Sequence, residues 1–299
     1  MLAVGHAGLS DTDPRALGEA VLACWDAFLA VVTAPTTDLS RPSRLAGWTG
    51  ADTCIHLGAW PDSQPLQGLL ASARADGAGQ DGDPDRVNAD LVVAHRDEGS
   101  AAVVAALREA RDALAEFFAS DLPAQLGRQV SRSAVGPLPV LSLVHAGTYE
   151  LAVHALDLAP CGAPAPDPLL LDRGLAALMD VTGALSARAG VRTTVTAQTG
   201  AYGWSCTSGG GGWQVQRVPG GAYAGCGVRG SAADLLDTSA GRTNLGQLLL
   251  TRRLVVQDLP AFLTLAPLLH EVPGLPGGAA LRAAMGGLGR ITRLLRLGR

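Results

Sequence analysis

Apolar residues recur at helical spacing through the first half of the chain. After Asp13 and Pro14, which make a good N-cap and first helical residue, they fall on one helical face at Ala16, Ala20, Cys24, Ala27 and Val31. We therefore expect a helix from Pro14 onward. Similar patterns predict a helix over residues 50–60, a long helical stretch over 86–118 that Gly99 can break, and a helix over 137–158.

The pattern changes after residue 158. Residues 159–168 are rich in proline and are typical of a linker. The pattern over residues 169–190 predicts a helix. In residues 191–200 and 212–221, apolar and polar residues alternate and β-branched residues are frequent, which predicts two strands with a glycine-rich turn at 206–213 between them. A short helix capped by Ser231 follows, and 254–269 predict a strand and then a helix.

These elements predict an α+β protein with two domains. Four amphipathic segments in roughly 160 residues are typical of a four-helix bundle, and we assign it to residues 10–160. A smaller α+β domain is expected at 169–270, followed by a basic tail at 271–299. The last 20 residues hold five arginines and no acid, so the tail is interpreted as a terminal helix with a solvated basic side, and contact with an anionic ligand or a membrane surface is the alternative.

Composition and charge limit the classes of protein to which the chain can belong. The chain has 299 residues and a net charge of -4, which argues against a nucleic-acid-binding protein. Its five cysteines form no C-x-x-C pair, and no apolar run approaches a membrane span, so we expect a cytoplasmic protein. All basic residues are arginine, and alanine, glycine and leucine are abundant, as in the GC-rich genomes of actinobacteria.

Glu150 and His154 stand one helical turn apart among apolar residues. Positions i and i+4 share a helix face, so both side chains can reach one divalent metal ion. His56, on another apolar helix, is the candidate third ligand. Two histidines and one glutamate leave a coordination position open, which is typical of catalytic zinc. The alternatives are a chance surface pair at 150 and 154, and a hydrogen-bonded core histidine at 56.

Two stretches resemble a known family. LAGWTGADTCIHL (45–57) is similar to the G-W-T-x-x-D-x-x-x-H-L signature of the mycothiol-dependent maleylpyruvate isomerase family, in the DinB-like superfamily, and YELAVHALDL (149–158) to its E-x-x-x-H-x-x-D signature. The resemblance implies a DinB-like bundle in which His56, Glu150 and His154 bind a divalent metal, usually zinc. Leu156 stands where a tryptophan is common in the family. This difference affects which substrate is expected more than whether a metal is bound.

The second domain resembles the family's sterol-carrier-protein-like C-terminal domain. The matching run is VRGSAADLLDTSAGR (228–242), where the family has an arginine after glycine at the active site. The resemblance therefore implies a catalytic role for Arg242, although Arg229 lies nearby in the sequence. Trp48 is our candidate for contact with the cofactor, and packing at the start of its helix is the alternative.

The resemblance implies mycothiol as cofactor and an electrophilic small molecule as substrate. Metal binding can stabilise a thiol as thiolate, which adds to an electron-poor double bond. Rotation and elimination then give isomerisation, whereas retention of the thiol gives S-transfer. Asp52 or Asp157 could orient a ligand imidazole, and Asp52 could instead stabilise a helix start. The rival hypothesis is a non-catalytic protein that binds a small molecule between its domains.

One further motif is discounted. GCGVRG (225–230) matches G-x-G-x-x-G but lacks a clear βαβ unit around it, so we interpret it as a turn.

Overall fold

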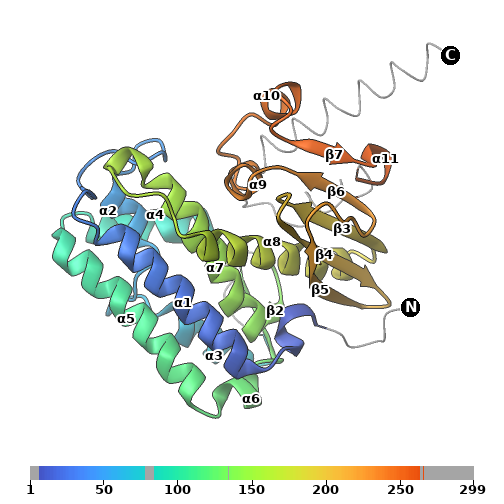
Figure 1. Ribbon diagram of the computed structural model, residues 1–299. Coiled ribbons are helices and arrows are strands. Elements are labelled where there is room, and N and C mark those ends of the chain that lie inside the picture. The colour runs from blue at the N-terminus through green and yellow to red at the C-terminus, as the bar shows by residue number, and fades with distance from the viewer. Residues whose placement is uncertain (1–6, 78–83, 134, 263–264, 266–299) are drawn as a thin grey trace. The chain divides into compact units, whose positions relative to one another are not determined.

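The computed structural model describes residues 7–77, 84–133, 135–262 and 265. Helices and strands combine there into an α+β fold, as predicted (Figure 1). The chain divides into two compact units, one formed by Leu9–Ala177 and the other by Leu178–Arg299 together with Met1–Gly8. The division falls inside one helix rather than in the proline-rich stretch at 159–168. The boundaries at 10–160 and 169–270 stay predictions.

The first unit is mainly helical. Its helices and short strands are η1 (Gly8–Asp11), α1 (Pro14–Val32), α2 (Gly50–Ile55), α3 (Pro65–Arg74), α4 (Pro84–His95), α5 (Ser100–Ala119), α6 (Leu122–Leu126), β1 (Val130–Ser131), β2 (Leu138–Pro139), α7 (Val140–Asp157) and η2 (Ala159–Cys161). The strands β1 and β2 pair antiparallel just before α7.

The helix after Asp13 forms as predicted. The Asp13 carboxylate accepts a hydrogen bond from the backbone N–H of Arg15 at 3.1 Å, which caps α1. The apolar face of α1 packs against α5 and α7, and Val21 and Phe28 on that face are fully buried. α1 and α5 run alongside each other in Figure 1. The core of this unit therefore lies between α1, α5 and α7.

The helix predicted at 50–60 is shorter than expected. α2 ends at Ile55, and His56 is its C-cap. The indole N–H of Trp60 donates to the Ile55 carbonyl at 2.8 Å, and the Leu57 N–H bonds back to Cys54 rather than one residue earlier. These bonds end the helix because they replace the regular pattern of a continuing turn.

The stretch at 86–118 is two helices, α4 and α5, separated near Gly99 as the sequence allows. His95, the last residue of α4, stacks on Trp60 with 4.0 Å between ring centroids. Its Nε2 also lies 2.9 Å from an Asp62 oxygen. The helices α3 and α6 and the short strands were not predicted, because their sequences are too short to show a clear period.

The second unit is built on a mixed sheet. α8 (Pro168–Arg188) leads into it, and the sheet has the order β5-β4-β3-β6-β7. Its strands are β3 (Thr193–Gln198), β4 (Tyr202–Gly209), β5 (Gly212–Pro219), β6 (Cys226–Arg229) and β7 (Val255–Gln257). β3 and β6 are parallel and the other pairs are antiparallel. The remaining helices are α9 (Ala232–Ser239), α10 (Leu245–Leu250) and α11 (Leu259–Phe262).

Side chains tie α8 to the sheet. The indole N–H of Trp213 on β5 donates to the Asp180 carboxylate at 2.7 Å. The ring lies so close to Gly183 that a Cβ there would meet it at 2.7 Å. A glycine at this position of α8 therefore allows the close approach of helix and sheet.

The glycine-rich turn predicted between two strands forms but is shorter than 206–213, whereas the turn predicted at 225–230 was wrong. Residues 206–209 belong to β4, and only Gly210 and Gly211, both with positive φ, form the turn to β5. GCGVRG is not a turn, because β6 runs through it beside β3. A Cβ at Gly227 would meet the Thr196 carbonyl oxygen at 2.5 Å, so glycine serves close strand packing here. By contrast, the helix capped by Ser231 forms as predicted.

Only part of the predicted C-terminal strand, helix and tail falls within the described residues. β7 and α11 match the strand and the start of the helix expected at 254–269. The tail at 271–299 lies outside the described residues. Among the helices that are described, none is long and apolar enough to cross a membrane.

Candidate metal centre

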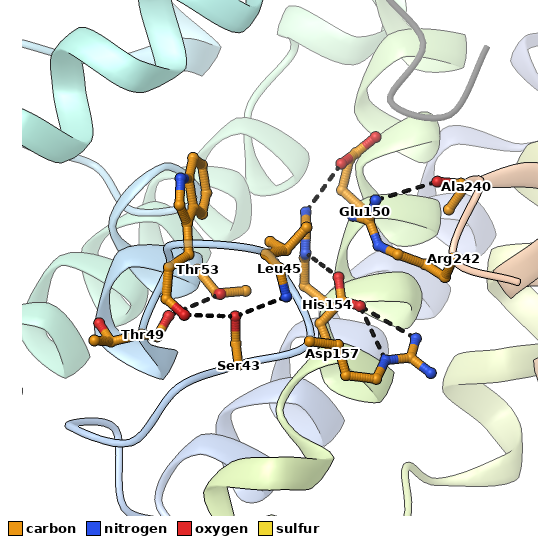
Figure 2. Close-up of polar contacts among 11 residues, drawn as sticks. Ser43, Leu45, Thr49, Thr53, Glu150, His154, Asp157, Ala240 and Arg242 are labelled. Carbon is orange, nitrogen blue, oxygen red and sulfur yellow. Dashed lines mark hydrogen bonds and ion pairs between the residues drawn. The ribbon is translucent and has the colours of Figure 1, made fainter. Parts of the chain in front are cut away.

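One face of α7 carries two side chains of types that can bind a metal. Glu150 and His154 lie one turn apart, with 3.4 Å between Glu150 Oε2 and His154 Nε2 (Figure 2). The His154 side chain is 6% exposed, whereas that of Glu150 is 50% exposed. The pair therefore lies at the edge of the helical core, with the imidazole inside and the carboxylate reaching outward.

His56 joins this pair from the end of α2. Its ring centroid is 4.6 Å from that of His154, and the two rings are nearly perpendicular at 82°. The potential ligand atoms of His56, Glu150 and His154 all lie within 4.8 Å of one another. Folding thus brings His56 next to two side chains that lie 94 and 98 residues further along the chain.

The donor set fits a divalent metal. Two imidazole nitrogens and one carboxylate are the ligands of many zinc sites in proteins. Nδ1 of His56 is buried and makes no hydrogen bond of normal geometry, although the Thr53 backbone is close enough to affect the ring, so this atom remains available to a ligand. The three residues predicted as ligands are therefore arranged as such a site requires.

The two histidines have opposite pKa shifts. Burial, followed by the nearby charge of His154, lowers the pKa of His56 to about 3. Burial also lowers the pKa of His154, but hydrogen bonds to Asp157 and Glu150 outweigh it, so the pKa of His154 is raised. His56 is accordingly neutral near pH 7, which is the form that binds a metal.

Asp157 lies directly behind His154. One carboxylate oxygen is 3.0 Å from Nδ1 of His154, and the Asp157 side chain is fully buried. The other oxygen accepts from the Arg44 guanidinium, at 3.2 Å from Nε and 3.1 Å from Nη2. Figure 2 shows His154, Asp157 and the bonds that link them. Arg44 was missed by sequence reasoning, because nothing in the sequence relates it to a residue 113 positions away.

Asp52 acts at the start of α2. One of its oxygens accepts from the backbone N–H of Thr49 at 2.8 Å, while the Thr49 hydroxyl accepts from the Asp52 N–H. The other oxygen pairs with Arg96 at 3.2 Å. These bonds form a capping box, so of the two interpretations of Asp52 the structure supports the helix start.

Trp48 lies beside the histidine cluster. The centroid of its ring is 5.6 Å from that of His56, with an edge-on geometry of 63°. The tryptophan thereby packs against a candidate ligand from the loop that precedes α2. Contact with a cofactor stays a prediction.

Arg242 belongs to the second unit, after α9. Its backbone N–H donates to the Asp237 carbonyl at 2.7 Å, and its Nη1 donates to the Ala240 carbonyl at 3.1 Å (Figure 2). With Arg253 and residues of α10, it lines a pocket of about 310 Å³. Arg253 also pairs with Asp234, 3.3 Å from Nε to the carboxylate. The catalytic role of Arg242 stays a prediction.

Comparison with solved structures gives the same fold for most of the chain. The crystal structure of the mycothiol-dependent maleylpyruvate isomerase is 16% identical, with a TM-score of 0.50, and the match covers 79% of this chain and 92% of that one. A histidine-to-alanine mutant of that enzyme gives 15% identity with the same TM-score and coverage. None of the curated protein sequences matches significantly.

The sequence profile of one family matches the helical part of the chain. It is the mycothiol maleylpyruvate isomerase N-terminal domain, and the match extends over residues 21–159. This range contains all three candidate ligands as well as Trp48, Arg44 and Asp157. Residues 21–159 therefore belong to the mycothiol maleylpyruvate isomerase N-terminal domain family.

Proposed function

We propose that the protein is a zinc-dependent enzyme that uses mycothiol to act on an electrophilic small molecule, as an isomerase or an S-transferase. The observation that carries this proposal is the convergence of His56, Glu150 and His154 within 4.8 Å. The family of residues 21–159 and the fold of the solved isomerase support mycothiol as the thiol.

Each residue of the cluster has a distinct part in holding the metal. His56 is kept neutral by burial and is ready to bind. Glu150 would supply a negative charge, and Asp157, 3.0 Å from Nδ1 of His154, would hold a proton there and leave Nε2 as the atom available to the metal. When bound, zinc stabilises the thiolate form of a coordinating thiol. The three side chains leave a coordination position for that thiol.

Two further residues are proposed to act on the small molecules. Trp48 contacts the cofactor beside His56, consistent with its position 5.6 Å from that ring. Arg242 assists catalysis, consistent with the resemblance of residues 228–242 to the family's active-site segment. We also infer that the helical unit is a DinB-like four-helix bundle, that the second unit is sterol-carrier-protein-like, and that the enzyme is cytoplasmic.

The test compares wild type with His154→Ala in an assay that contains zinc, mycothiol and maleylpyruvate. We expect turnover that requires all three components and is lost in the variant. Accumulation of a mycothiol conjugate, in place of an isomerised product, would identify an S-transferase. A folded wild-type protein that does not bind zinc, and that neither isomerises maleylpyruvate in the presence of mycothiol nor forms a mycothiol conjugate with it, would contradict the proposal and favour the non-catalytic binding protein.

A further inference from the structure

We propose that Arg44 is a positioning residue of the metal centre, which acts through Asp157 to fix the orientation of His154. This inference rests on the proposed metal site. Arg44 lies in the loop between α1 and α2. It is not one of the three candidate ligands. The observed contacts lead from Arg44 to His154 through the carboxylate that the two residues share.

The contacts form a continuous chain from Arg44 to the candidate ligand. Nε and Nη2 of Arg44 lie 3.2 and 3.1 Å from Oδ1 of Asp157. The second oxygen, Oδ2, lies 3.0 Å from Nδ1 of His154. The opposite ring atom, Nε2, is the one that faces Glu150. One carboxylate group thus divides its two oxygens between the guanidinium and the imidazole.

Burial explains why this carboxylate needs an arginine. The Asp157 side chain is fully buried, and a buried carboxylate without a positive partner is strongly disfavoured. The rigid guanidinium reaches it from a side chain that is 29% exposed. Because two nitrogens of the guanidinium approach one oxygen, the plane of the carboxylate is restricted more than a lysine would restrict it. Oδ2 is then held toward His154.

The loop that carries Arg44 is tied to the same end of α7. The backbone N–H of Arg44 donates to the Asp157 carbonyl at 3.0 Å, so both its main chain and its side chain bind one residue. The Asp38 N–H donates to the Cys161 carbonyl at 2.9 Å, and the Cys161 thiol lies 3.4 Å from the Arg41 carbonyl. These bonds give Arg44 a fixed position relative to His154, as a positioning role requires.

The experiment measures zinc affinity by competition with a chelator in wild type and in Arg44→Gln. Loss of an outer partner of a metal ligand typically lowers affinity about 10- to 100-fold, and we expect a decrease of about tenfold for this more remote residue. We also expect the visible spectrum of the cobalt-substituted protein to change, because the ligand field depends on how His154 is oriented.

Arg111→Gln is the matched control. Arg111 also pairs with a carboxylate through two nitrogens, at 3.0 and 3.3 Å from Asp26, and its side chain is likewise 29% exposed. It joins α5 to α1 and contacts no residue of the cluster. We expect the control to keep both the wild-type zinc affinity and the wild-type cobalt spectrum.

A double variant tests the route through Asp157. If Arg44 acts through this carboxylate, Arg44→Gln combined with Asp157→Asn should bind zinc about as tightly as Asp157→Asn alone. Should Arg44→Gln fail to fold, Arg44→Lys replaces it, with a smaller expected loss. Wild-type zinc affinity and an unchanged cobalt spectrum in the folded Arg44 variant would overturn the inference. A wild type that binds no zinc would instead overturn the proposed function.

Discussion

The two histidines of α7 have similar burial but different surroundings. His145 is 1% exposed and His154 is 5% exposed, and they stand nine residues apart on the same helix. Around His154, Asp157 and Glu150 approach the two ring nitrogens, and the ring of His56 lies at 4.6 Å. Around His145, Nδ1 is buried without a hydrogen-bond partner, and the nearby charge is that of Arg173.

The difference shows what distinguishes a candidate ligand from a core histidine. Burial, with the positive charge of Arg173, lowers the pKa of His145 to about 3, so that this ring is simply neutral. At His154 burial acts in the same direction, but two carboxylates reverse it. What makes a buried imidazole a candidate metal ligand is therefore its neighbours: a second imidazole and a carboxylate that converge with it, and a further carboxylate that lies beside its other ring nitrogen.

The strongest test of this difference removes a ligand. His56→Ala and His154→Ala should each lower zinc affinity by more than about a hundredfold, since loss of an outer partner alone costs about 10- to 100-fold. Helix content should stay close to that of wild type. Metal analysis after dialysis, together with circular dichroism, checks both points. Full metal occupancy in both variants would show that the cluster is not the site.

A milder change removes only charge. Glu150→Gln keeps the shape of the side chain but not the negative charge that offsets the cation, and we expect zinc affinity to fall about tenfold or more. Stability of the metal-free protein should change by only a few tenths of a kcal/mol, because the side chain is half-exposed. Titration against a competing chelator measures the first effect and chemical unfolding the second. Equal zinc affinities would remove Glu150 from the ligand set.

Acid should destabilise the metal-free protein partly through His145, in addition to His56, whose pKa is also lowered. The folded protein leaves the His145 ring neutral down to about pH 3, whereas the unfolded chain protonates it below about 6.5. The unfolded state thus binds more protons in this window, and stability falls as the pH is lowered, by up to about 1.4 kcal/mol per pH unit for one group. Urea unfolding at pH 7 and pH 4 should show a smaller loss in His145→Gln than in wild type. Equal losses would contradict the neutral, buried state of His145.

The smallest expected effect concerns the same substitution and the metal. His145→Gln should leave zinc affinity within about twofold of wild type, which is less than about 0.5 kcal/mol. The reason is that His145 is not part of the candidate cluster, which consists of His56, Glu150 and His154. A chelator competition identical to that used for Glu150→Gln provides the comparison. A tenfold loss would mean that the two halves of α7 are coupled.

Several features could be predicted from the sequence because they depend on local spacing. The i, i+4 relation of Glu150 and His154 follows from helix geometry alone, and the cap at Asp13 from the residues around it. His56 could be named as a candidate third ligand from its place on another apolar helix, but only the family resemblance tied it to Glu150 and His154, since long-range packing leaves no local signal. Arg44 could not be found, because its partner lies across the fold. The strand β6 was missed because glycines, which usually mark turns, here allow close strand packing.

The most direct test of the metal centre is X-ray absorption at the zinc edge of the zinc-loaded wild-type protein. We predict a first shell of nitrogen and oxygen at about 2.0–2.2 Å, with the multiple-scattering signature of two imidazoles. All five cysteines are buried and free, so no sulfur should contribute. A shell that contains sulfur at about 2.3 Å, or that shows no imidazole, would contradict the account.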